Sequence, residues 1–318
     1  MSGPQRHRPT AQGPAIPPES QIAPLLKSLR IHQWVKNVLV FVPIVLAGKF
    51  TELGALTDTA IAFVALCVLA SGTYVLNDIR DLPDDRKHRS KRDRPLASGR
   101  LSFAVAATFV PIAMVMSLGI GTFASSNVLA VLVAYLCLTL LYTFKLKQYA
   151  LVDCFVLAVL YTLRLVLGTV AADAAWSSWL LVFSMFMFMS LSLAKRHAEI
   201  IDVMTGDDVT LGGRGYNTDD APALMALGVS SGVGAVLIMV LYIVEDAFRQ
   251  SFYGDTIWLW GFPPLLFLFV SRIWLVCHRG SMSEDPVAFA LKDRFSLALL
   301  AVLIVCFGFA WLGPQWYR

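Results

Sequence analysis

The sequence predicts an all-α integral membrane protein with nine transmembrane helices. Of its 318 residues, 57% are hydrophobic and only 15% are charged, and the mean hydropathy is +0.66. Soluble domains are far less apolar. Nine apolar stretches are long enough to cross the ~30 Å hydrocarbon core of a bilayer.

The predicted spans are joined by mostly short connections on one side and by longer, charged connections on the other. They cover residues 35–50, 57–76, 101–122, 128–144, 151–172, 176–194, 221–244, 256–277 and 295–312. The first is the shortest and begins among polar residues. No internal repeat and no strand pattern accompanies them.

The distribution of Lys and Arg orients the predicted bundle. With nine spans, 22 of the 26 basic residues fall on one side, the other side holds only Lys49, Arg249 and Arg318, and Arg164 lies within a span. Short cytoplasmic loops retain positive charge, so the N-terminus is expected inside and the C-terminus outside. We expect a multi-pass protein of the cell (plasma) membrane whose active site lies on the cytoplasmic face. The net charge of +4 is no argument for a nucleic-acid partner, because the basic residues cluster on one membrane face. There anionic lipid headgroups and phosphorylated substrates are the expected partners.

The rest of the chain suggests one domain with a tail. Residues 1–24 hold six prolines and no apolar core, which predicts a disordered cytoplasmic tail before a single membrane domain over 25–318. The five cysteines lie singly in apolar spans and are interpreted as small hydrophobic residues rather than disulfides or metal ligands. The sequence leaves a monomer and a homo-oligomer equally open.

A group of acidic residues at the inner end of the second span is the main candidate site. Asn77 and Asp78 are followed by Asp81 and Asp85, a spacing that places the three carboxylates on one helical face. Pro83 should end that helix, so Asp85 is expected on the following turn. From there its carboxylate could bind the same cation as Asp78 and Asp81. Three carboxylates beside a diphosphate suit Mg²⁺. The alternative is a solvated acidic helix end neutralised by neighbouring Arg and Lys residues.

Basic residues flank this motif on both sides in the sequence. Arg94 lies in the loop that follows, where it could bind phosphate through a bidentate fork or act only as a topology determinant. Lys36 and Asn37 lie at the start of an apolar run, where an unpaired ammonium is costly unless it binds phosphate or reaches the surface. Arg30 and Gln33 precede them.

Further candidates lie at the inner ends of later spans. They are Tyr142, Lys147 and Asp153 around the connection between the fourth and fifth spans, Arg164 deep in the fifth, Lys195, Arg196 and Glu199 after the sixth, and Arg214 and Tyr216 in the following segment. Each has a structural alternative. Arg164 could tie to a carboxylate on another helix, Lys195 and Glu199 could form an exposed ion pair, and the last segment could merely connect two helices.

The nine-span layout with the motif Asn77-Asp78-x-x-Asp81-x-x-x-Asp85 resembles the UbiA superfamily of intramembrane prenyltransferases. The similarity covers the chain from about residue 24 to its end. Members of that family use Mg²⁺ on Asp-rich motifs to activate a diphosphate leaving group. The resemblance implies an enzyme whose metal ligands are Asp78, Asp81 and Asp85.

The chain departs from most of that family after the sixth span. There it carries Lys195-Arg196-His197-Ala198-Glu199 in place of a second Asp-rich cluster, which favours direct anion contacts over a second metal. Together with the polar residues before the first span, this resembles the decaprenyl-phosphate phosphoribosyltransferase branch. That branch implies phosphoribosyl pyrophosphate (PRPP) as donor and a polyprenyl phosphate as acceptor, for arabinan (arabinogalactan) synthesis in the cell wall.

The resulting hypothesis is Mg²⁺-dependent transfer of 5-phosphoribosyl to a polyprenyl (decaprenyl) phosphate with release of pyrophosphate. Asp78, Asp81, Asp85 and Lys36 are the predicted catalytic residues, and the remaining candidates are predicted to bind substrate. An aromatic prenyltransferase that uses a prenyl diphosphate is the first alternative. A lipid or solute transporter is the second, since many helices and an intramembrane Arg also suit transport.

Overall fold

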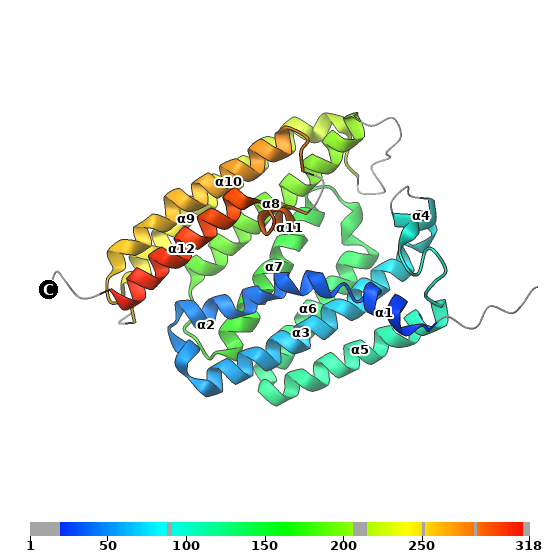
Figure 1. Ribbon diagram of the computed structural model, residues 1–318, viewed down its shortest axis with the longest axis horizontal. Helices are drawn as coiled ribbons and strands as arrows, with labels where there is room; N and C mark the ends of the chain where they lie inside the picture. The colour runs from blue at the N-terminus through cyan, green and yellow to red at the C-terminus, as the bar shows by residue number, and fades with distance from the viewer. Residues whose placement is uncertain (1–19, 88–90, 206–214, 250–251, 283–284, 314–318) are drawn as a thin grey trace, which may run out of the picture.

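The computed structural model describes residues 20–87, 91–205, 215–249, 252–282 and 285–313, and these residues form helices and connections without a strand (Figure 1). Eight of the helices are long and apolar enough to cross a membrane, and a bent pair of helices at the start makes a ninth crossing if it is counted as one span. The predicted all-α membrane fold is confirmed.

The first span is broken rather than continuous. It consists of α1 (Ile22–Ser28), the 3₁₀ segment η1 (Ile31–Phe41) and α2 (Val42–Leu46), with a bend of 43° between α1 and the rest. Arg30 makes the bend in a left-handed conformation, with φ 52°. The predicted start at residue 35 is too late, because the polar residues that interrupt the apolar run face α3. Trp34, for example, donates from Nε1 to Ser71 Oγ at 3.0 Å.

The start of α1 also shortens the predicted tail, because residues 22–24 are helical. Residues 1–19 lie outside the described part of the chain, so the prediction of disorder there stays a prediction.

Seven of the other eight crossings among the described residues match the predicted spans to within four residues at each end. They are α3 (Leu53–Arg80), α5 (Phe103–Ala124), α6 (Ser126–Phe144), α7 (Val152–Ala171), α8 (Ser178–Thr205), α9 (Ala221–Glu245), η7 with α10 (Thr256–Gly261 and Phe262–His278) and α12 (Arg294–Leu312). Shorter elements connect them: η2 (Lys49–Thr51), α4 (Leu82–Lys87), η3 (Lys91–Asp93), η4 (Leu146–Gln148), η5 (Thr218–Asp220), η6 (Ala247–Arg249) and α11 (Pro286–Ala290). The helix α8 continues well past the predicted end at residue 194, so its basic residues are helical.

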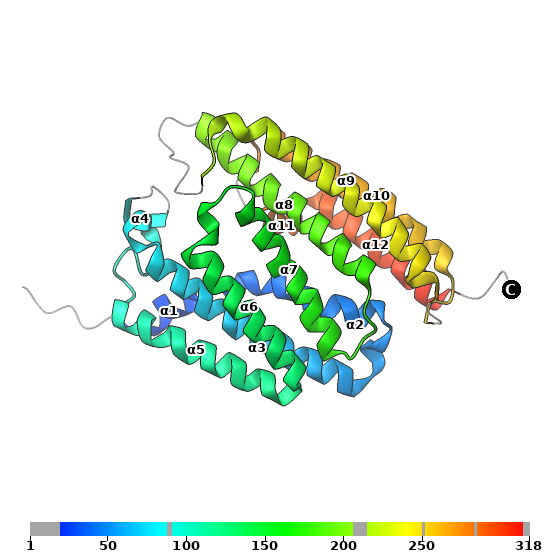
Figure 2. The same ribbon diagram turned by 180° about the vertical axis from the view of Figure 1, so that it is seen from behind.

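Two groups of helices pack on opposite faces of α7 (Figures 1 and 2). On one face, Val156 and Leu160 join a core with η1, α3 and α6, and on the other, Cys154 and Ala158 join a core with α8, α9 and α10. As a result α7 is the most buried of the spans. Polar side chains on α7 therefore lie at the centre of the molecule.

The contact between η1 and α7 depends on Gly168. A Cβ atom at this position would lie 2.0 Å from the carbonyl oxygen of Val40, closer than any real contact, so only glycine lets the two backbones approach. This approach brings Asn37 against Arg164, one helical turn from Gly168.

The first and last helices of the chain lie toward opposite ends of the bundle. The elements α1 and α4 lie at one end in Figure 1, and the last turn of α12 lies at the opposite end. This separation agrees with an odd number of crossings. The assignment of the first end to the cytoplasm stays a prediction.

Candidate active site

The acidic motif occupies the junction between α3 and α4. The helix α3 ends at Arg80 and α4 begins at Leu82, which puts Pro83 in the first turn of a new helix, where its missing N–H costs nothing. The Asp85 N–H donates to the Asp81 carbonyl at 2.8 Å. The predicted break before Pro83 is confirmed, and this tight turn returns Asp85 toward α3.

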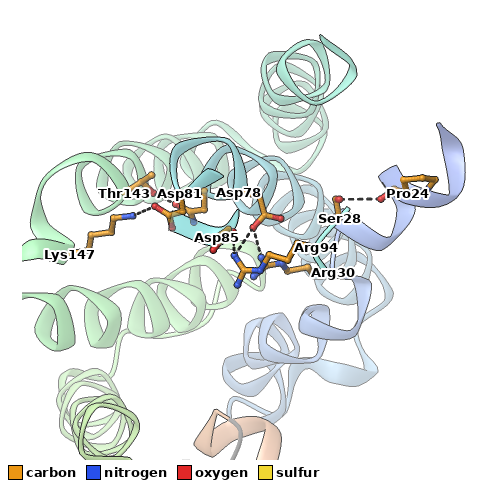
Figure 3. A network of polar contacts seen from close by, with 10 residues as sticks. Pro24, Ser28, Arg30, Asp78, Asp81, Asp85, Arg94, Thr143 and Lys147 are labelled. Atoms are coloured by element: carbon orange, nitrogen blue, oxygen red, sulfur yellow. Dashed lines mark hydrogen bonds and ion pairs between the residues drawn. The ribbon is translucent and has the colours of Figure 1, made fainter. Parts of the chain in front are cut away.

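Asp78 and Asp85 share one cation. Nη1 of Arg94 lies 3.2 Å from Asp78 Oδ1 and 2.6 Å from Asp85 Oδ2, and Nη2 of Arg30 lies 2.5 Å from the same Asp78 oxygen (Figure 3). Both carboxylates are buried, with 3% of each residue exposed. Charge-assisted pairs of this kind hold the two carboxylates in fixed positions.

Asp81 turns the other way, toward Lys147 (Figure 3). Nζ of Lys147 lies 2.6 Å from Asp81 Oδ1, and this carboxylate is more exposed than its neighbours. Asn77 accepts a hydrogen bond from Thr143 Oγ1 at 2.8 Å. Among the described residues no group of three acidic, His or Cys side chains converges as a metal site. The prediction that all three aspartates hold one Mg²⁺ therefore stays a prediction.

The donor set of Asp78 and Asp85 nevertheless fits a divalent cation. Mg²⁺ is usually held by one or two carboxylates together with substrate phosphate oxygens and water. Here two buried carboxylate oxygens face one position, which a guanidinium nitrogen of Arg94 holds. A metal bound with a diphosphate could take that position if Arg94, whose side chain is partly exposed, turned toward phosphate.

A pocket of about 190 Å³ lies beside this motif, between η1, α3, α6, α7, α8 and α11. Asn77 is part of its wall, so the pocket adjoins the motif directly. Its charged lining residues are the cations Lys36, Arg164 and Lys195 and a single carboxylate, Asp285. Four tyrosines also line it: Tyr74, Tyr135, Tyr142 and Tyr161. The lining is thus cationic and rich in hydroxyl groups.

Asp285 lies between two of the cations. Its Oδ2 is 3.1 Å from Lys36 Nζ and 3.3 Å from Lys195 Nζ. Burial alone would raise the pKa of Asp285, but Lys195 and Lys36 together lower it to about 2. Asp285 was not among the predicted site residues. Its signal was the Asp-Pro start of a short helix, since Oδ1 accepts from the Val287 N–H at 3.0 Å as an N-cap.

Arg164 is buried at the base of the pocket and has neutral partners. Its Nε donates to Asn37 Oδ1 at 3.0 Å, and Nη2 donates to the Tyr135 hydroxyl at 3.0 Å. The guanidinium carbon also lies 4.8 Å from the centre of the Tyr161 ring, a cation–π contact. Within the described residues no carboxylate contacts it, which argues against the predicted structural alternative of an ion pair. The pocket therefore retains the positive charge of Arg164.

A second set of candidates forms a network of side chains that do not line the pocket. Arg196 donates from Nε to Asp153 Oδ2 at 2.6 Å and pairs with Glu199. The Tyr216 hydroxyl donates to Asp153 and accepts from the Leu151 N–H at 2.8 Å. Burial raises the pKa of Tyr216, so this hydroxyl keeps its proton. These contacts fasten α7, α8 and the segment before α9 to one another.

The structure thus separates the predicted site residues by position. Those at the Asp motif are Arg30, Asn77, Asp78, Asp81, Asp85, Arg94 and Lys147, and those on the pocket wall are Lys36, Asn77, Tyr142, Arg164 and Lys195. Asn37 contacts Arg164, and Gln33 is half-buried on η1. Arg214 lies outside the described residues. The hydroxyls of Tyr74, Tyr135 and Tyr161 were missed, although tyrosines inside apolar spans need polar partners.

Residues 38–295 match the model of the UbiA prenyltransferase family. The chain belongs to this family. Most of the bundle falls within the matched region, which includes Asp78, Asp81 and Asp85 and every residue that lines the pocket except Lys36.

The chain is similar in sequence to proteins that have different names. The uncharacterized protein y4nM of Sinorhizobium fredii is 39% identical over 284 residues, which are 89% of this chain but only 55% of y4nM, so this chain spans about half the length of that relative. The nodulation protein NoeC of Azorhizobium caulinodans is 31% identical over 86% of this chain and 89% of its own. Decaprenyl-phosphate phosphoribosyltransferase of Mycobacterium tuberculosis is 30% identical over 90% of this chain and 93% of its own.

Solved structures agree on the fold. A UbiA homologue from Archaeoglobus fulgidus bound to GPP and Mg²⁺ superposes with a TM-score of 0.69, covering 90% of this chain and 99% of that chain at 13% identity. This likeness extends over nearly the whole bundle and confirms the family architecture.

Proposed function

We propose that this member of the UbiA family transfers a 5-phosphoribosyl group from PRPP to a polyprenyl phosphate and releases pyrophosphate. The observation that carries the proposal is the charge of the pocket, where three cations face one carboxylate beside the acidic motif. Donor and acceptor together would bring three phosphate-bearing groups. The name of the mycobacterial relative supports the same chemistry.

The side chains at the motif would divide the work of binding the donor. Mg²⁺, when held by Asp78 and Asp85 with Asp81 nearby, supplies neutralisation of negative charge on the leaving pyrophosphate. Arg94 and Arg30 would turn their guanidinium groups toward phosphate oxygens, which they bind through a planar fork. Lys147 would contribute a point charge at the exposed side of the motif.

The acceptor needs little activation from the protein. A phosphate monoester is already ionised near neutral pH, so its oxygen can attack without a strong general base. Its polyprenyl tail would lie in lipid between helices, which keeps apolar surface out of water. In this proposal the reaction takes place at the cytoplasmic face of the plasma membrane, and its product serves arabinan assembly in the cell wall.

The second candidate is prenyl transfer from a prenyl diphosphate to an aromatic acceptor. The family name and the archaeal homologue bound to GPP and Mg²⁺ support it. An aromatic acid would bring only one negative charge to the pocket, whose lining has three cations and one carboxylate. Family membership favours either transferase over the transporter alternative.

Two parallel incubations of protein in lipid nanodiscs separate the candidates. One contains labelled PRPP, polyprenyl phosphate and Mg²⁺, and the other contains a labelled prenyl diphosphate, an aromatic acid and Mg²⁺. We expect a labelled polyprenyl-phosphoryl phosphoribose and stoichiometric pyrophosphate only in the first. A prenylated aromatic product with no phosphoribosyl lipid would overturn the proposal.

A further inference from the structure

The carboxylate of Asp285 lies where an anionic substrate group would be expected. It enters the pocket from the start of α11 and contacts Lys36 of η1 and Lys195 of α8. These three elements are far apart in the sequence, and the carboxylate is the contact they share. Both lysines line the pocket, and their side chains are only 12% and 35% exposed.

The two oxygens of this carboxylate have separate roles. Oδ2 faces both ammonium groups, whereas Oδ1 accepts the N–H of Val287 and caps α11. The cap therefore does not require the contact with the lysines. Breaking that contact leaves the start of α11 with its hydrogen bond.

The charges around Oδ2 are unbalanced. Two ammonium groups face one carboxylate, and Arg164 adds a third positive charge whose contacts are neutral. Uncompensated charge is costly in surroundings of low dielectric constant. A phosphate monoester carries nearly two negative charges at neutral pH and three acceptor oxygens, so it balances two lysines better than a carboxylate does.

We propose that Lys36 and Lys195 form a binding subsite for a phosphate monoester and that the Asp285 carboxylate occupies this subsite until the substrate displaces it. The inference rests on the proposed function and deepens it, because both proposed substrates carry such a group. One is the 5-phosphate of the donor and the other is the phosphate of the lipid acceptor. The acidic motif then remains available for the pyrophosphate of the donor.

Equilibrium binding to purified protein in nanodiscs tests the subsite without turnover. Ribose 5-phosphate and farnesyl phosphate are the two probes, and ribose and farnesol are their neutral controls. The variant Asp285→Asn removes the competing charge but retains an N-cap residue of equal quality. We expect the Kd of one monoester to fall about tenfold, equivalent to ~1.4 kcal/mol, and the probe that responds identifies the source of the phosphate. Lys36→Gln and Lys195→Gln should each weaken the same probe.

Asp293→Asn is the matched control. Asp293 also caps a helix, α12, and pairs with an arginine, Arg272, but it does not line the pocket. Its substitution should leave both Kd values unchanged. Asp285→Ser also preserves a cap and should lower the Kd of the same monoester as Asp285→Asn does. It replaces Asp285→Asn in the experiment if that variant is unstable.

Three results would overturn the inference. They are unchanged or weaker monoester binding in both Asp285 variants, equal gains for the neutral controls, and absence of monoester binding in wild type and variants alike. The first would mean that Asp285 positions the lysines instead of competing for them. A tenfold gain in binding without phosphoribosyl transfer would instead contradict the proposed function and leave the subsite intact.

Discussion

The ion pairs at the end of α3 and those around Arg196 of α8 contain the same kinds of side chain but differ in how completely the arginine is enclosed. At the end of α3, the arginines that pair with Asp78 are 26% and 29% exposed, and one guanidinium nitrogen serves two carboxylates. Within α8, the Arg196 side chain is 3% exposed and pairs with Asp153 and Glu199. We expect the first arrangement to exchange a cation for a ligand and the second to hold helices together.

The largest expected effect is on activity at the open arrangement. Asp78→Asn should reduce phosphoribosyl transfer on the order of 10³-fold, because it removes one of two carboxylates that would hold the metal beside the leaving group. The protein should stay folded, with wild-type elution and thermal unfolding. Initial rates of pyrophosphate release across a Mg²⁺ titration measure the loss.

Asp81→Asn is the internal comparison for that experiment. Asp81 faces Lys147 and does not share Arg94 with Asp78 and Asp85. Its substitution removes one charge-assisted contact, so the rate of transfer should fall only about tenfold. Equal losses in the two variants would show that all three carboxylates act on one cation, as the spacing first suggested.

The next largest effect is on stability at the enclosed arrangement. Arg196→Met should lower the free energy of unfolding by roughly 3–5 kcal/mol, because it leaves Asp153 buried without its cation. Adding Asp153→Asn should restore part of this loss, since the amide oxygen can still accept from Tyr216. Thermal unfolding of both variants in one detergent provides the measurement.

Activity per folded molecule distinguishes this structural role from substrate binding. The double variant Asp153→Asn, Arg196→Met should turn over within about threefold of wild type, as expected where no transition-state contact is lost. A stable but inactive double variant would move these residues into the binding site.

The smallest effect is expected at an exposed pair on the opposite end of the bundle. Arg249 and Glu245 lie 2.6 Å apart with side chains 74% and 43% exposed. Arg249→Gln should change the free energy of unfolding by less than about 0.5 kcal/mol and leave transfer unchanged. A larger change by thermal unfolding would show that exposure is a poor guide to which pairs matter in this protein.

Much of the fold was predictable because hydropathy and charge are local properties of the chain. Eight crossings coincide with predicted spans, and the break before Pro83 follows from its ring. The first span was misjudged at its start, because polarity in sequence does not reveal that Trp34 and Asn37 find partners on neighbouring helices. Arg164 was recognised as buried, but its neutral partners were not predictable.

By itself the sequence determined eight of the apolar crossings in the described part of the chain and the presence of an acidic motif at a helix end. The gathering of basic residues on one side of the membrane stays a prediction. Only the tertiary structure decided which charges meet: Asp78 with Asp85 around Arg94, and Asp285 between two lysines. Such pairings join residues far apart in the chain. They depend on how each helix is rotated and how closely backbones approach, as at Gly168, and spacing along one helix does not specify either.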